Sequence, residues 1–255
     1  MASKIYEPEE YARELLSSLS LSRIQNLDEI LCALKLKVVE RNLNSVDGIL
    51  VRKSGKGIIA IKQSIKEIGR KNFTICHEIG HYILPGHGTV ACKSDEIESW
   101  KSNLLSHEVE ANKFASELLL PTSAIFPLVE RNGANISLIK EIANDFQTSL
   151  TAAAFKCIAI TEERCALIWS IDGQIKWFTK SESFRCYLPM QRLDSDSLAC
   201  QLSRAIVSQV LEGEVYADAW IEDDSLSSND KVWEESISLP AYNGVLTILT
   251  LESRQ

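Results

Sequence analysis

The spacing of hydrophobic positions predicts helices and then a small sheet in the first quarter of the chain. Apolar residues recur at helical spacing through residues 7–33, which predicts two helices joined near residues 20–22. Short apolar runs typical of strands follow, at residues 36–41, 48–53 and 57–62. Turn residues separate these runs, so this part of the sequence predicts a helical pair followed by three strands.

An apolar helical segment comes next, at Arg70–Leu84. Its apolar side chains occupy both faces of the predicted helix, which is typical of a helix buried between other layers. Pro85-Gly86 then ends it. Residues 86–106 are mostly polar and irregular and predict a loop, with Trp100 as its largest apolar residue.

The segment after Pro121 predicts further helices. A short helix is expected at residues 122–130, and two more within residues 136–160, with a turn at residues 147–149. This is the outline of a helix-turn-helix. Basic and acidic residues cancel over residues 129–160, whereas a DNA-contacting helix needs cations to neutralise phosphates, so packing or partner contact is favoured.

From Arg164 onward the pattern predicts an α+β domain. Two strands flank Asp172-Gly173, a sequence that favours a hairpin turn. An amphipathic helix is expected at residues 196–212. Three further strands are expected, at residues 215–222, 232–240 and 244–252.

The predicted helix at Arg70–Leu84 carries the clearest chemistry. His77 and His81 are four residues apart, so on a helix they lie one turn apart on the same face and can bind one metal ion. Glu78 lies beside them but out of line, where it can take a proton from the attacking water. Burying two imidazoles and a carboxylate costs free energy unless these groups have a binding partner. This context therefore favours a metal site over two structural histidines.

A zinc site needs a third protein ligand, and two residues compete for that role. Glu108, on a second predicted helix at His107–Leu120, shares the face of Ala111 and Ala115, whose small side chains would let another helix approach closely. Asn112 lies directly behind Glu108 and would orient a ligand. This placement favours Glu108, while Glu110 is expected on the charged, solvent-facing side.

His87 is the alternative metal ligand. It follows His77 by ten residues, the offset of the third histidine in metzincins, but that motif has a glycine three residues before its last histidine. Leu84 occupies this position here.

These residues together resemble a known family. HEIGHYIL, at residues 77–84, followed by EVEANKFASELLLP, at residues 108–121, is similar to the ImmA/IrrE family of cytosolic bacterial metallopeptidases. The resemblance implies a zinc endopeptidase with His77, His81 and Glu108 on Zn²⁺, or on another divalent metal such as Mn²⁺, and with Glu78 as the catalytic residue. It also implies a substrate, since known members cut a helix-turn-helix repressor and so relieve transcriptional repression in stress responses or mobile-element control. For the C-terminal part it suggests a GAF-like sensor or docking domain.

Composition and charge indicate the class of protein and its cellular compartment. A hydrophobic content of 45% favours folded domains over disorder. Charged residues interrupt the N-terminus, no apolar run is long enough to span a membrane, and the seven cysteines form no CxxC pair. We therefore expect a cytoplasmic protein with reduced thiols and no membrane partner.

The net charge of −8 is unevenly distributed along the chain. Residues 35–71 carry ten basic against three acidic residues, while residues 161–255 carry eight against sixteen. No direct DNA binding is expected from this balance. The basic stretch would suit an acidic substrate segment, and solvated strand edges would explain it equally well.

The sequence thus predicts an α+β protein in three parts. These are a zincin-like peptidase domain at residues 1–121, a helix-turn-helix-like segment at 122–160 and a C-terminal α+β sensor or docking domain at 161–255. The expected activity is zinc-dependent endopeptidase cleavage of a protein substrate. The alternative is a non-catalytic, metal-containing regulatory protein that acts through protein partners.

Overall fold

The computed structural model describes residues 7–53, 56–87, 91–92, 106–223, 226–227 and 229–251. The chain forms two compact units, one made of Met1–Ile125 with Ile142–Ala152 and the other of Phe126–Glu141 with Ala153–Gln255. The predicted loop around Trp100 lies outside the described residues. The division into three domains stays a prediction.

The first unit begins with the two predicted helices, α1 (Pro8–Ser18) and α2 (Leu27–Ala33). The Asn26 side chain caps α2 by accepting a hydrogen bond from the Asp28 backbone N–H at 2.9 Å. Both helices bury one apolar face.

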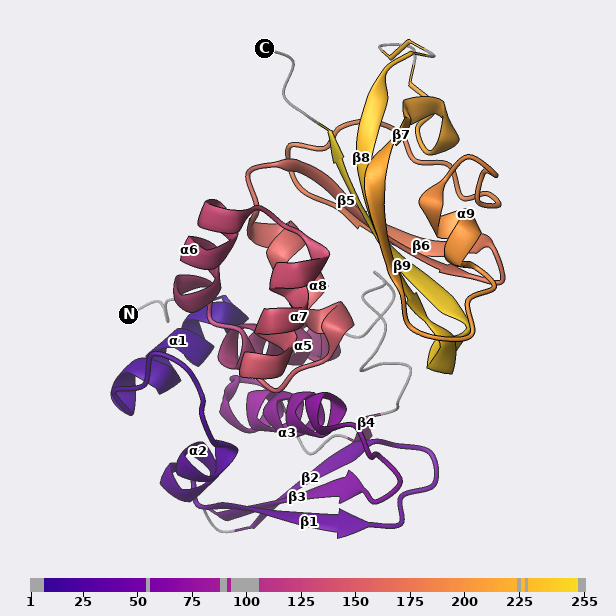
Figure 1. The fold of residues 1–255 in the computed structure, drawn as a ribbon. Coiled ribbons are helices and arrows are strands. Elements are labelled where there is room, and N and C mark those ends of the chain that lie inside the picture. Colours follow the sequence, from indigo (N-terminus) through magenta and orange to yellow (C-terminus); the bar gives the residue numbers. More distant parts are fainter. Residues whose placement is uncertain are drawn as a thin grey trace. The chain divides into compact units, whose positions relative to one another are not determined.

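A four-stranded sheet follows, made of β1 (Leu36–Arg41), β2 (Gly48–Lys53), β3 (Lys56–Lys62) and β4 (Ala91–Cys92). Its order is β1-β3-β2-β4 (Figure 1). β1 pairs with β3 in parallel, and the other two pairings are antiparallel. The three strands predicted from sequence are confirmed, whereas β4 was not expected. β4 lies at the edge of the sheet, beside the first residues of β2.

Two helices pack side by side in this unit, α3 (Ile68–Ile83) and α5 (Ser106–Leu119) (Figure 1). A glycine makes their close approach possible, because a Cβ atom at Gly80 would lie 3.1 Å from Phe114 Cδ1 and 3.3 Å from Ala111 Cα. α3 also contacts β2 and β3, so it lies between the sheet and α5. The prediction of a helix buried between layers is confirmed.

Residues 122–160 form three helices, α6 (Thr122–Asn132), α7 (Ile136–Asp145) and α8 (Leu150–Ile160). Gln147, in the turn between α7 and α8, has a φ of 48°. The predicted pair of short helices and its turn are confirmed.

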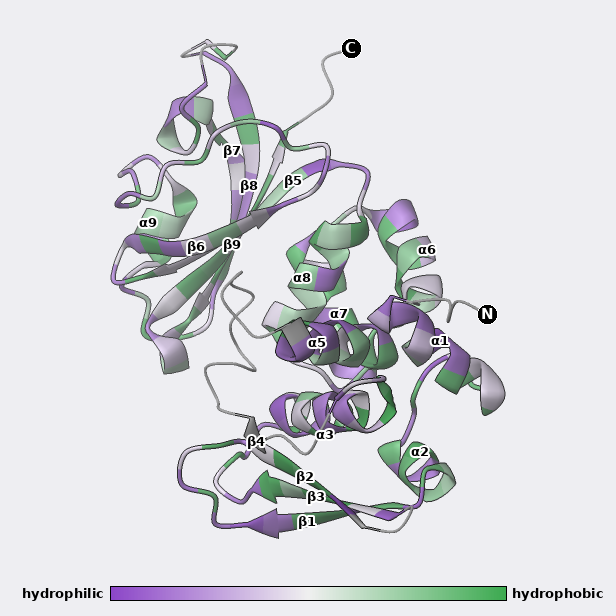
Figure 2. Ribbon diagram, turned by 180° about the vertical axis from the view of Figure 1, so that it is seen from behind, coloured by the Kyte–Doolittle hydropathy of each residue, from purple (hydrophilic) through white to green (hydrophobic). Residues whose placement is uncertain are grey.

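The second unit contains a five-stranded antiparallel sheet in the order β6-β5-β9-β8-β7. Its strands are β5 (Arg164–Ile171), β6 (Gln174–Lys180), β7 (Val210–Tyr216), β8 (Lys231–Leu239) and β9 (Gly244–Leu251). The central strand, β9, is buried along most of its length and is coloured as hydrophobic in Figure 2. Asp172 and Gly173 have φ angles of 52° and 70°, which is the left-handed pair that a tight hairpin turn requires.

Helices cover both faces of this sheet. Phe155 of α8 stacks on Trp177 of β6, with the ring centroids 5.0 Å apart. On the other face, α9 (Leu198–Leu202) and the 3₁₀ turn η1 (Ala217–Ala219) are held by the buried Glu234. Its carboxylate accepts hydrogen bonds from the Ala199 backbone N–H at 2.6 Å and from Trp220 Nε1 at 2.8 Å. A second 3₁₀ turn, η2 (Pro240–Tyr242), joins β8 to β9.

The helix predicted at residues 196–212 is wrong beyond its first part. Only α9 is helical, and Val210 already begins β7. Burial in β7 alternates residue by residue, and the strand pairs with β8 along its whole length. This pairing overrides the weak helical periodicity, since β structure depends on partners distant in sequence. The strand predicted at residues 215–222 is likewise replaced by the end of β7 and by η1.

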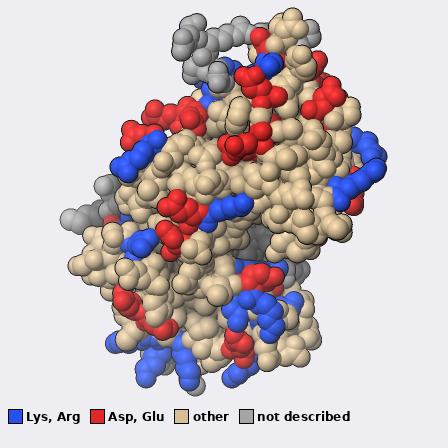
Figure 3. All heavy atoms as spheres, in the orientation of Figure 1, with Lys and Arg blue, Asp and Glu red and all other residues tan. Residues whose placement is uncertain are grey.

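Basic side chains gather over β1–β3 on the face drawn in Figure 3, whereas acidic side chains are more frequent over the second unit. This surface matches the uneven charge of the sequence. Within the described residues, no helix combines the length and apolarity that crossing a bilayer requires.

Candidate metal centre

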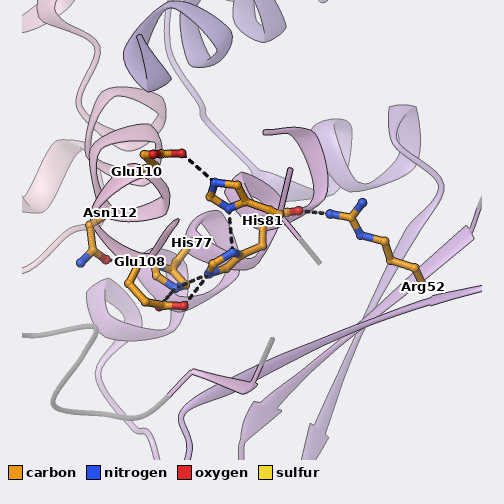
Figure 4. Close-up of polar contacts among 7 residues, drawn as sticks. Arg52, His77, His81, Glu108, Glu110 and Asn112 are labelled. Atoms are coloured by element: carbon orange, nitrogen blue, oxygen red, sulfur yellow. Dashed lines mark hydrogen bonds and ion pairs between the residues drawn. The ribbon is translucent and has the colours of Figure 1, made fainter. Parts of the chain in front are cut away.

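Three buried side chains converge between α3 and α5. His77 Nε2 lies 3.1 Å from Glu108 Oε2, and His81 Nε2 lies 3.1 Å from His77 Nε2 and 3.3 Å from Glu108 Oε1 (Figure 4). Within the described part of the chain, this is the one group of three or more His, Cys, Asp or Glu side chains whose potential ligand atoms all lie within 4.8 Å of one another. The structure therefore brings together the residues that the sequence singled out.

The geometry of this group fits a divalent metal ion. A tetrahedral ion with bonds of about 2.0–2.1 Å holds its ligand atoms about 3.3 Å apart, close to the three separations observed here. Two nitrogens and one carboxylate oxygen are also a donor set that zinc uses in catalytic sites, which keep a further position open. The residues present can therefore hold such an ion.

Helices α3 and α5 position the three side chains of this group. His77 and His81 are one turn apart on α3, so their rings project from the same face. Glu108 lies in the first turn of α5. The close packing at Gly80 brings that turn within reach of both rings.

Hydrogen bonds position both histidines, His77 through its ring and His81 through its backbone. Asn112 Oδ1 lies 2.9 Å from His77 Nδ1, so the ring donates its Nδ1–H there and turns the Nε2 lone pair toward Glu108. Arg52 on β2 donates from Nη2 to the His81 carbonyl oxygen (Figure 4). Its guanidinium also lies over the Tyr82 ring. Sequence reasoning anticipated Asn112 but not Arg52, whose partner is a backbone atom on a distant element.

The electrostatics of the group favour the forms that bind metals. Burial lowers the pKa of His81, outweighing the opposing effect of the nearby Glu108 carboxylate, so the imidazole is neutral at neutral pH. Burial acts to raise the pKa of Glu108, but the two imidazoles beside its carboxylate, His77 and His81, lower that pKa well below its usual range. His81 is thus a neutral imidazole and Glu108 an ionised carboxylate, the forms that a metal ion requires.

Glu78 is fully buried and lies against β2. A Cβ atom added at Gly48 would come within 2.5 Å of Glu78 Oε1, so the carboxylate occupies space that only a glycine leaves. Gly48 also pairs with Cys92 of β4. The carboxylate is therefore held near the edge of the sheet and is not one of the three converging groups.

His87 stands outside the converging group. Its Nδ1 lies 2.9 Å from His81 Nδ1, the nitrogen on the far side of that ring from Glu108, and its Nε2 lies 2.9 Å from Glu110 Oε2. Burial lowers the pKa of His87. The side chain of Glu110 is 37% exposed, yet it contacts His87, a partner that helical spacing alone did not reveal.

The chain is also similar to known proteins. Residues 33–157 match the protein family described as the IrrE N-terminal-like domain. The resemblance to the ImmA/IrrE family, first suggested by the two motifs, is thereby confirmed.

Two individual proteins are also similar. A stretch of 96 residues is 31% identical to the radiation response metalloprotease IrrE of Deinococcus radiodurans, and covers 37% of this chain and 28% of that protein. A Mycobacterium tuberculosis transcriptional regulator matches over 97% of this chain and 77% of its own, with a TM-score of 0.55 and 12% identity. The likeness to that regulator is therefore one of fold alone.

Proposed function

We propose that the protein is a zinc-dependent endopeptidase that cleaves a helix-turn-helix repressor and so relieves transcriptional repression. The observation that carries this proposal is the convergence of His77, His81 and Glu108, with Glu78 next to His77 on the same helix. The IrrE N-terminal-like family and the radiation response metalloprotease support it.

In this proposal each residue has a defined role. His77, His81 and Glu108 hold Zn²⁺, or another divalent metal such as Mn²⁺, and Asn112 orients His77. When bound, the metal supplies Lewis acidity that acidifies water and polarises a carbonyl. Glu78 accepts the proton of the attacking water and later delivers it to the leaving amine.

The sheet offers a place for the substrate backbone. β4 lies at the edge of the sheet and pairs with β2 at Gly48, the residue against which Glu78 lies. An extended peptide that adds to such an edge is held by main-chain hydrogen bonds. We propose that the scissile bond reaches Glu78 in this way.

The remaining parts are proposed to select the substrate. The helix-turn-helix-like segment is proposed to pack or contact a partner rather than DNA, and the GAF-like C-terminal domain to sense a signal or dock the repressor. The structural likeness to a transcriptional regulator is compatible with a role in gene control. The cytoplasm is the proposed location, and six cysteines of the described chain are free thiols, as reducing conditions require.

The decisive experiment compares wild type with Glu78→Gln. A repressor encoded beside this protein would be incubated with each form and examined by mass spectrometry for a single cut. Glu78→Gln is expected to keep its metal but to lose about two to four orders of magnitude in rate, since an amide cannot take the proton. Glu67→Gln, at an exposed position just before α3, is the matched control and should cleave normally.

Two outcomes would count against the proposal. Cleavage by Glu78→Gln at the wild-type rate would remove Glu78 from the reaction. Repressor binding without any cleavage by wild type would instead favour the non-catalytic regulatory protein.

A further inference from the structure

All four histidines of the chain form one continuous row. The ring centroids of His77 and His81 are 4.7 Å apart, those of His81 and His87 are 5.0 Å apart, and those of His87 and His107 are 4.4 Å apart. Only the first two rings belong to the candidate metal centre. The third, His87, is buried and contacts His81 at Nδ1, the ring nitrogen that faces away from Glu108.

The turn after α3 places His87 there. Leu84 leaves the helix with extended backbone angles, and Gly86 adopts a φ of 84°, which a residue with a side chain rarely does. The chain thereby reverses, and His87 packs its ring against that of His81. Pro85-Gly86 therefore not only ends α3 but also turns the chain so that His87 reaches His81.

The hydrogen-bond chain through His87 has a single direction that leaves His81 able to bind a metal. An ionised carboxylate only accepts, so His87 donates its Nε2–H to Glu110 across 2.9 Å. A neutral His87 then has a lone pair on Nδ1, which accepts the Nδ1–H of His81 across 2.9 Å. His81 is left with its lone pair on Nε2, the nitrogen that faces Glu108 and His77.

The opposite direction would disable the centre. If His87 donated from Nδ1, then His81 would carry its proton on Nε2 and would point an N–H at the position that a metal ion would occupy. Carboxylate partners behind metal-binding histidines fix the tautomer and raise the basicity of the ligand in other sites. Here a second imidazole stands between the carboxylate and the ligand.

We propose that His87 and Glu110 are positioning residues that hold His81 in its metal-binding tautomer and orientation. This inference rests on the proposed metal site, and it assigns to His87 a role other than that of a third ligand. It also gives His77 and His81 separate supports, since Asn112 serves the first ring and the His87–Glu110 pair serves the second.

The test measures zinc affinity by chelator competition in the full-length protein. His87→Leu, which fills similar space without an acceptor, is expected to weaken zinc binding about 10- to 100-fold, the scale for loss of such a support. His87→Gln, whose amide oxygen can accept the His81 Nδ1–H, is expected to recover most of that loss. Glu110→Ala should weaken binding in the same direction, while Glu29→Gln, an exposed carboxylate on α2, is the control and should leave it unchanged.

A second measurement reads the tautomers directly. With four histidines, a long-range ¹H–¹⁵N spectrum of the zinc-loaded protein can be assigned by substituting them one at a time. The proposal predicts His81 protonated on Nδ1 and His87 protonated on Nε2. His87 with both nitrogens protonated, or protonated only on Nδ1, would overturn it.

The outcomes separate this inference from the proposed function. Wild type that binds no zinc would refute the metal site itself. Wild type that binds zinc, with His87→Leu binding equally well, would refute only the positioning role. A cobalt-substituted His87→Leu whose visible spectrum shows one fewer nitrogen ligand would also overturn it, because His87 would then be a ligand.

Discussion

At the scale of single residues, the catalytic proposal depends on a glycine as much as on a glutamate. Gly48 leaves the space that the Glu78 carboxylate occupies, and a methyl group there would lie 2.5 Å from its oxygen. The carboxylate ends a flexible side chain and can move aside, but the same methyl group would also lie 2.9 Å from Thr74 Cγ2 on α3. The substitution would therefore displace the base and, to a smaller extent, adjust the packing of α3 against β2.

Gly48→Ala is accordingly expected to lower the rate of repressor cleavage by about tenfold or more while the zinc content stays near that of wild type, since general acid–base catalysis requires hydrogen-bond reach. Cleavage kinetics and metal analysis check this together. Gly213→Ala on β7 is the control, because its Cβ would meet only Leu198 Cδ1 at 3.9 Å. Unchanged cleavage by Gly48→Ala would show that Glu78 does not act from the position seen here.

Sequence reasoning reached some of these residues and not others, for a physical reason. His77, His81 and Glu78 follow from helical spacing within one segment, and Glu108 follows from its place beside two alanines. The contact of Glu110 with His87 depends on a turn with a left-handed glycine, which periodicity does not describe.

At the scale of elements, the centre depends on how closely α3 and α5 approach. Two of its residues come from α3 and one from α5, so any separation of the helices moves Glu108 away from the imidazoles. Gly80 lies at the contact, facing Phe114 and Ala111.

Gly80→Val is therefore expected to weaken zinc binding about tenfold or more and to lower the melting temperature, because its methyl groups would push against Ala111 and Phe114. Chelator competition and thermal unfolding measure the two effects. Lys113→Val, at an exposed position of α5, isolates the lower helix propensity of valine and should leave zinc affinity unchanged. Full zinc affinity in a folded Gly80→Val protein would contradict the dependence on helix spacing.

Elements were predictable where the pattern is local. β1 and β2 begin and end where the sequence placed them, and α3 and α5 do so within two residues. The parallel pairing of β1 with β3 and the strand β7 were not foreseen, since both depend on partners distant in sequence. The same limit explains the helix wrongly predicted at residues 196–212.

At the scale of the whole molecule, packing makes the thiols unequal. Cys32 is exposed, whereas Cys157 and Cys165 are buried. Burial raises the pKa of each buried thiol to about 12, and because the thiolate is the nucleophile, both should be inert in the native protein.

Iodoacetamide at pH 8 is thus expected to modify Cys32 rapidly and to leave Cys157 and Cys165 unmodified until denaturant is added. Peptide mass spectrometry before and after unfolding gives the comparison. Rapid native labelling of Cys157 or Cys165 would mean that the core of the second unit is more open than described.

The account as a whole stands on one divalent metal held by His77, His81 and Glu108. Elemental analysis of protein purified without chelator tests this most directly, with His81→Ala as the comparison. We predict about one equivalent of zinc or a similar divalent metal in wild type and little or none in His81→Ala. Wild-type protein that carries no metal and takes up none on titration would contradict the account.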